Sequence, residues 1–158
     1  MIKIVAVGKI KEKYFVDGIQ EYIKRLGPYT KIEIIEVPDG ACAPNASIAE
    51  QELVKQKEGD AILSKIKEDE VVICLDLHGK NYNSLEISKK LEEISTYQSS
   101  KVTFTIAGSM GYSEKVIQRA NLRWCLSNCT FPHQIVRLLL VEQIYRSYKI
   151  RKNENYHK

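Results

Sequence analysis

The chain has 158 residues, of which 44% are hydrophobic and 28% are charged, and its formal net charge is +4. These values indicate one folded domain spanning residues 1–158 and exclude a disordered, collagen-like or membrane-embedded protein. Aliphatic runs such as Leu138 to Val141 are far shorter than the roughly 20 apolar residues of a membrane-spanning helix. The N-terminus has no secretory signal pattern, so we expect a cytoplasmic protein without a membrane partner.

The first half of the chain alternates predicted strands and helices. The expected elements are a strand at Met1–Gly8, a helix at Lys13–Leu26 that stops at Gly27-Pro28, a strand at Lys31–Val37, a turn-rich connection at Pro38–Ser47, and a helix at Ile48–Ile66. The last of these helices is expected to bury Leu53, Val54, Ala61 and Ile62. The connection is too short to separate two domains.

The second half continues the alternation. It predicts strands at Val71–Leu75, Val102–Ile106 and Arg123–Leu126, and helices at Ser84–Ile94, Ser113–Ala120 and Pro132–Ile150. The strand at Val71–Leu75 is apolar without alternation, which predicts burial on both faces. Together these elements favour an α/β domain with a mostly parallel sheet flanked by helices and connected by right-handed crossovers.

Ligands of such sheets collect beyond the carboxyl ends of the strands, which directs attention to the loops after Leu75, Ile106 and Leu126. The second loop, Ala107 to Gly111, contains glycines that let the backbone approach a bound group. It is not a full dinucleotide fingerprint, so by pattern alone an ordinary strand-to-helix turn is favoured. We therefore find poor support for a nucleotide-dependent enzyme of another class.

The four cysteines are too sparse for a disulfide scaffold. Cys125, Cys129 and His133 are spaced by four residues, which in a continuous helix would place them on one face. Because Cys125 falls in a predicted strand and no second pair of ligands exists, we expect no metal site. No serine, histidine and aspartate arrangement for nucleophilic catalysis is visible either.

The last predicted helix has a broad apolar surface, which indicates burial on two sides, against the sheet and against another subunit. His133 and Arg137 lie one turn apart, and each has either a structural or a functional explanation. Glu142 is expected to pair with Arg146, four residues later. The following tail, through Lys158, interleaves cationic and aromatic residues and suits either RNA contact or a solvated end.

Five segments together resemble the ribosomal RNA large subunit methyltransferase H family. They are Val5-Ala6-Val7-Gly8-Lys9, Ile34-Ile35-Glu36-Val37-Pro38, Lys57-Glu58-Gly59, Thr130-Phe131-Pro132-His133 and Tyr156-His157-Lys158. The resemblance covers essentially the whole chain. It implies the SPOUT class, with a C-terminal trefoil knot and a homodimer that has cofactor sites at its interface. It also implies methyl transfer from S-adenosylmethionine to N3 of a pseudouridine in 23S rRNA on assembled ribosomes, with no DNA partner.

The same resemblance assigns the methyl-donor pocket to the three loops. The corresponding residues are Leu75, Ala107, Gly108, Leu126, Ser127, Asn128, Cys129, Thr130 and Phe131. The family usually has two glycines where this chain has Ala107-Gly108, and the extra methyl group could crowd the donor. A protein of the same fold that binds RNA or the ribosome without catalysis is therefore the alternative.

Methyl transfer to an imide nitrogen requires loss of its proton. Our hypothesis is that His133, or His157 from the tail, assists this loss, while Arg137 binds phosphate or developing negative charge. Tyr156 and His157 are expected to close over the site when RNA binds.

Overall fold

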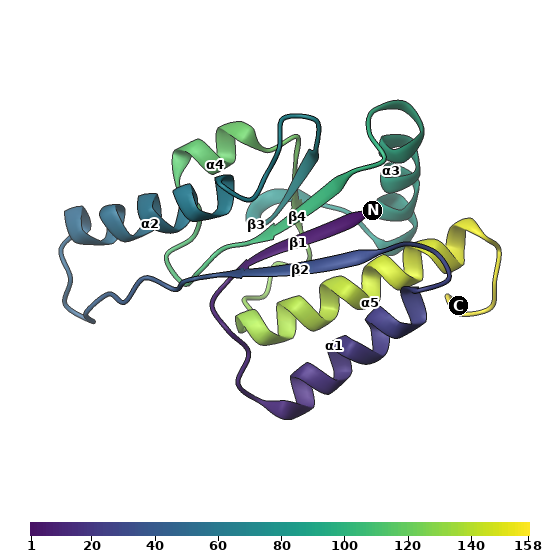
Figure 1. Ribbon diagram of the computed structural model, residues 1–158, viewed down its shortest axis with the longest axis horizontal. Coiled ribbons are helices and arrows are strands. Elements are labelled where there is room, and N and C mark those ends of the chain that lie inside the picture. Colours follow the sequence, from purple (N-terminus) through teal and green to yellow (C-terminus); the bar gives the residue numbers. More distant parts are fainter.

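Five parallel strands form the centre of the computed structural model, which describes residues 1–158. The sheet order is β2-β1-β4-β3-β5, and Figure 1 shows the strands with helices around them. The strands are β1 (Ile2–Val7), β2 (Ile32–Val37), β3 (Val71–Asn81), β4 (Val102–Ile106) and β5 (Leu122–Cys125). The predicted α/β class with a parallel sheet is confirmed.

Five helices cover both faces of the sheet. They are α1 (Lys13–Leu26), α2 (Ile48–Leu63), α3 (Ser84–Tyr97), α4 (Glu114–Arg119) and α5 (His133–Arg151). Alternate residues of β1 contact different layers: Ile4 and Ala6 join the core that contains α1, α3 and α5, whereas Val5 and Val7 pack with Ile62 of α2. Strands buried on both faces require this double covering.

Helix α5 lies at the centre of the larger layer, between α1 and α3. Leu140, Val141 and Ile144 on this helix are completely buried. Pro132 stands immediately before the helix, a position where its missing N–H removes no helical hydrogen bond. Ser88 of α3 donates a hydrogen bond to the carbonyl of Ser147, which ties the two helices together.

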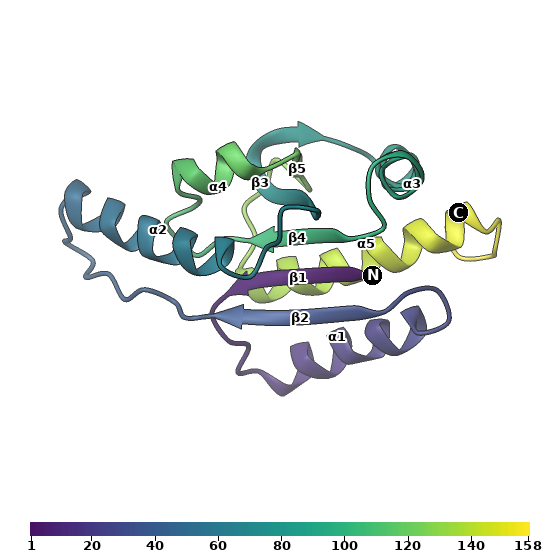
Figure 2. The same ribbon diagram turned by 45° about the horizontal axis from the view of Figure 1, so that its top comes forward.

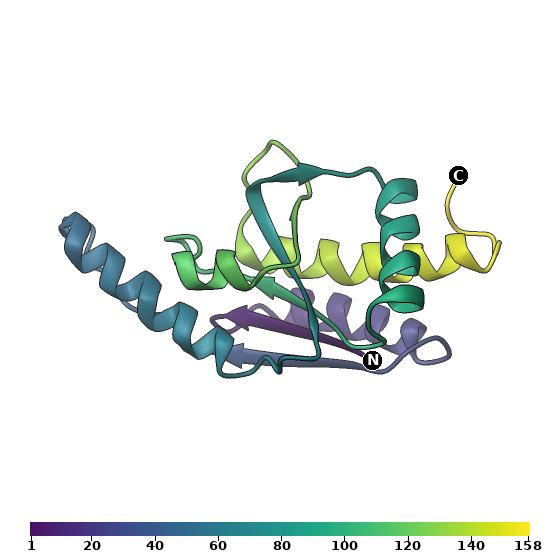
Figure 3. The same cartoon turned by 90° about the horizontal axis from the view of Figure 1, so that it is seen from above.

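Some element boundaries and one buried position differ from the sequence predictions. Helix α2 ends at Leu63 rather than Ile66, and Leu53 is 66% exposed rather than buried. Figure 3 shows that the outer part of α2 extends away from the sheet. Strand β3 continues beyond Leu75 to Asn81, because Lys80 and Asn81 at its polar end pair with Trp124 and Cys125 of β5.

The carboxyl ends of β1, β2 and β4 lie at one end of the molecule, whereas the last part of β3 turns back from it. The arrowheads of β2 and β4 mark that end in Figure 2, and both chain termini lie toward the opposite end. No helix is long and apolar enough to span a membrane. The trefoil knot that the family resemblance implies stays a prediction.

Candidate functional site

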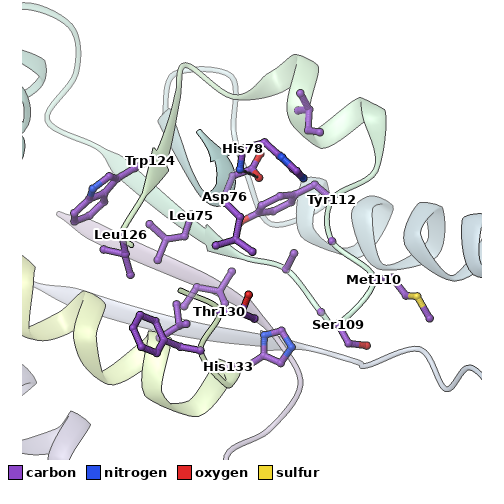
Figure 4. A pocket seen from close by; sticks show the side chains of 18 of the residues that line it. Leu75, Asp76, His78, Ser109, Met110, Tyr112, Trp124, Leu126, Thr130 and His133 are labelled. Carbon is purple, nitrogen blue, oxygen red and sulfur yellow. Dashed lines mark hydrogen bonds between the residues drawn. The ribbon is translucent and has the colours of Figure 1, made fainter. Parts of the chain in front are cut away.

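A cavity of about 730 Å³ opens beside the middle of β3 and beyond the carboxyl ends of β4 and β5. Its walls come from Leu75 to His78 within β3, from the loops that follow β4 and β5, and from residues of α2, α4 and the start of α5. Figure 4 shows Leu75, Leu126, Thr130 and His133 gathered about it. A cavity of this size, with apolar walls and a few polar groups, is typical of a site for a small organic ligand.

The turn after β4 forms one wall. Its backbone closes through a hydrogen bond from the N–H of Gly111 to the carbonyl of Gly108, at 3.0 Å. Gly111 has a φ of 84°, a conformation that residues with a side chain rarely adopt. Ser109 and Met110 at the tip of the turn also line the cavity.

The loop after β5 forms the facing wall. The Ser127 hydroxyl accepts a hydrogen bond from the N–H of Cys129, and the Ser127 carbonyl accepts one from the Cys125 thiol. These local bonds hold the loop in a compact shape, from which Leu126, Thr130 and Phe131 line the cavity. The wall therefore combines two apolar side chains with a hydroxyl group.

Three side chains at or next to the inner wall of the cavity, those of Asp76, Cys74 and Tyr112, are paired or protonated. The carboxylate of Asp76 accepts from Arg123 Nε at 2.8 Å and from the N–H of His78 at 3.0 Å. Burial raises the pKa of the Cys74 thiol to about 11, so it is not a thiolate at neutral pH. Burial also raises the pKa of Tyr112 well above its usual value. These three groups are therefore not free nucleophiles at neutral pH.

Most of the donor-site residues expected from the sequence come together here. Those that line the cavity are Leu75, Ala107, Gly108, Leu126, Ser127, Cys129, Thr130, Phe131 and His133. Asn128 lies in the same loop but does not line the cavity, and its side chain is exposed. Further lining residues that the sequence prediction did not name include Asp76, His78, Tyr112 and Trp124. These residues lie within β3 and β5 or soon after β4, so their positions in the sequence could have identified them as lining residues.

Arg137 does not line the cavity, although it lies one turn from His133. Its side chain is 7% exposed, and the guanidinium lies 2.6 Å from the Glu36 carboxylate and donates to the carbonyl of Gly8 at 3.2 Å. These contacts connect α5 to β2 and to the end of β1. They correspond to the structural explanation of Arg137 as an ion-pair partner.

Tyr156 and His157 lie beyond the far end of α5. The Tyr156 ring packs edge-on against Tyr145 at 4.8 Å, and its hydroxyl donates to Glu142 at 3.1 Å. His157 Nδ1 is 3.0 Å from Arg146, and Arg146 in turn pairs with Glu142, which confirms that predicted pair. The tail is thus packed on its own helix, remote from the cavity of the same chain.

No three histidine, cysteine, aspartate or glutamate side chains are grouped as metal ligands. Of the residues whose spacing suggested such a site, Cys125 is buried in β5 and Cys129 is exposed. The Cys125 thiol is engaged by the Ser127 carbonyl.

Ala107 is the position where the chain departs from the family pattern. It packs against the buried cluster of Val72, Cys74, Tyr112 and Val116, so its methyl group fills part of the core. We expect Ala107→Gly to change affinity for S-adenosylmethionine by less than about threefold in calorimetric titration. The same change should lower stability by roughly 0.5–1 kcal/mol in denaturant unfolding, because it removes a packed methyl group and adds chain entropy. A much tighter complex would instead show that Ala107 crowds the donor.

Comparison with known proteins agrees with this geometry. A family model described as predicted SPOUT methyltransferase matches residues 1–157. The chain is 50% identical over 157 residues to ribosomal RNA large subunit methyltransferase H of Desulforamulus reducens, covering 99% of this chain and 98% of that protein. It is 52% identical over 157 residues to the protein of the same name from Listeria monocytogenes, covering 99% of both.

A solved structure gives independent support for the fold. A probable methylase family protein from Haemophilus influenzae superposes with a TM-score of 0.53 at 12% identity, covering 99% of this chain and 70% of that one. At this identity the likeness concerns the fold alone. The match of the family model and the full-length relatives lead to one conclusion: this chain belongs to the SPOUT methyltransferase family.

Proposed function

We propose that this protein transfers a methyl group from S-adenosylmethionine to N3 of a pseudouridine in 23S rRNA, in the cytoplasm and on assembled ribosomes. The supporting observation is an open cavity formed by the middle of β3 and the loops after β4 and β5, in a chain about 50% identical to ribosomal RNA large subunit methyltransferases over its full length. Family membership favours this function over the alternative of a non-catalytic RNA-binding protein.

The residues of the cavity suit a methyl donor with a flat base and polar ends. Leu75, Leu126 and Phe131 provide apolar surface for the base, whereas Ser109 and Thr130 provide hydroxyl groups. Gly108 also lines the cavity, and because it has no side chain the turn can lie close against Glu58 of α2. When bound, the donor supplies a methyl group already activated by a positively charged sulfur.

The protein then has to align the acceptor nitrogen with the methyl carbon and remove the N3 proton. His133 is the titratable residue of α5 that lines the cavity, so we assign it the role of assisting proton loss. It stands at the first position of the helix, where the free backbone N–H groups also favour negative charge. The local field therefore favours the deprotonated imide.

The tail of one chain reaches the cavity of a second copy more directly than it reaches its own cavity. Helix α5 has 19 residues and is therefore about 28 Å long, with His133 at its start and the tail at its end. Tyr156 and His157 could reach their own cavity only by leaving their contacts with Tyr145 and Arg146. We infer that the protein acts as a homodimer in which each tail serves the partner's cavity.

The test uses ribosomes from cells that lack this gene. Incubation with the purified protein and S-adenosylmethionine should add the mass of one methyl group to a single pseudouridine-containing fragment of 23S rRNA. Calorimetric titration with the donor provides the second measurement. Donor binding without methylation of any ribosomal particle would exclude this substrate, whereas RNA binding without donor binding would support the non-catalytic alternative.

A further inference from the structure

A buried carboxyl group lies beneath the turn after β4 and has no part in the chemistry above. Glu58 on α2 is only 4% exposed, and its Oε2 accepts a hydrogen bond from the N–H of Gly40 at 2.8 Å. Its other oxygen, Oε1, is buried without a hydrogen-bond partner. None of the ion pairs includes Glu58. A carboxylate held in this way would be destabilising, so the neutral acid is favoured.

Gly108 rests directly on this carboxyl group. A Cβ atom at Gly108 would lie 2.8 Å from Oε1 and 3.0 Å from Oε2 of Glu58, closer than such atoms approach in proteins. Gly59, the next residue of α2, packs closely against Ser113, because a Cβ atom at Gly59 would overlap the Ser113 side chain. The segment from Gly108 to Ser113 therefore contacts α2 at both of its ends.

The surroundings of Glu58 disfavour its charged form. Burial raises the pKa of Glu58, and the negative charge of Asp39 raises it further, against the lowering effect of the Gly40 amide. The carboxyl group connects the loop after β2, through Gly40, with the turn after β4, through Gly108.

We propose that Glu58 is a positioning residue of the methyl-donor site, whose neutral carboxyl group holds the Gly40 amide, supports Gly108 and so sets the position of the turn. This inference rests on the proposed function, since the ligand of the turn is the donor. Glu58 does not line the cavity, so it acts only through the backbone of residues 108–111. Its loss should weaken donor binding and leave the chemical step nearly unchanged.

The experiment compares Glu58→Gln and Glu58→Ala in the full-length protein, with Asp60→Asn as the matched control. Asp60 lies on the same helix, and its side chain is 64% exposed. Calorimetric titrations with S-adenosylmethionine and with S-adenosylhomocysteine are combined with KM and kcat. Glutamine is neutral and of equal size, so we expect Glu58→Gln and Asp60→Asn to stay within about threefold of the wild-type affinity for both ligands. Glu58→Ala should lose about tenfold or more, with kcat within about twofold.

Three results would overturn the assignment in different ways. Equal losses in Glu58→Gln and Glu58→Ala would show that the ionised form is required. Unchanged donor affinity in Glu58→Ala would show that the carboxyl does not position the turn. A wild-type protein that binds neither ligand would refute the proposed function itself, together with this inference.

A suppressor experiment remains available if Glu58→Ala fails to fold. Gly108→Ala places a methyl group against the carboxyl and should weaken donor binding by about tenfold. The side chain of Glu58→Asp is shorter by one methylene, which moves the carboxyl group away from residue 108. The double variant Glu58→Asp with Gly108→Ala should therefore bind the donor better than Gly108→Ala alone. Simple additivity of the two changes would contradict a direct contact between Glu58 and the turn.

Discussion

Removal of Tyr156 to Lys158 is expected to lower methyl transfer by at least about a hundredfold, in the range of a lost general acid–base group, while the protein stays folded. Tyr156 is only partly buried and packs against the edge of the core, at Tyr145 and Glu142, so its loss should cost some stability without unfolding the protein. The donor cavity lies at the other end of the helix, so affinity for S-adenosylmethionine should be unchanged. Calorimetry, thermal unfolding and the ribosome methylation assay measure the three quantities separately.

A mixing experiment tests whether the tail serves the partner's site. One copy lacks the tail, and the other carries Thr130→Trp, which fills the cavity from an exposed loop position. Each homodimer is inactive, but a mixed dimer joins one open cavity with one intact tail. Random association should therefore restore about a quarter of the wild-type activity. No recovery from a mixture that exchanges subunits would show that the tail acts on its own cavity.

Much of the fold could be predicted because the strands are short, apolar and separated by helical periodicity. The helix at Lys13–Leu26 has the predicted bounds, and the sheet is parallel as expected. The errors occur where tertiary contacts decide the outcome. Leu53 fits the apolar pattern of α2 yet is exposed, and the polar end of β3 becomes a strand only because β5 pairs with it again. Local sequence carries no information on either contact.

The site could be predicted in part for a similar reason. Strand-end loops are recognisable from the order of the elements, so the sequence alone is enough to bring Leu75, Gly108 and Leu126 to one cavity. The direction of a side chain on a helix depends instead on what packs around it. His133 and Arg137 are one turn apart in sequence, but only His133 lines the cavity. Glu58 belongs to Lys57-Glu58-Gly59, one of the segments that resemble the family, but its role could not be predicted, because its contacts with Gly40 and Gly108 come from two distant loops.

Arg137→Ala is expected to lower the free energy of unfolding by roughly 2–3 kcal/mol, because it removes a buried guanidinium and leaves Glu36 and the Gly8 carbonyl without their donor. The Glu36 side chain is 36% exposed and can recover water, which keeps the cost below that of a fully buried pair. Denaturant unfolding measures this loss. At a temperature where the variant is folded, its kcat should stay close to that of the wild type.

Glu36→Gln distinguishes this structural role from a catalytic one. It breaks the same ion pair from the side of β2, so it should destabilise the protein, and a double-mutant cycle with Arg137→Ala should show a coupling energy of about 1 kcal/mol or more. If Arg137 instead bound RNA phosphate, its loss would reduce methylation in the folded protein while Glu36→Gln would not. Because the guanidinium is already engaged by Glu36 and by the end of β1, we expect the two variants to behave alike: both less stable, and both active when folded.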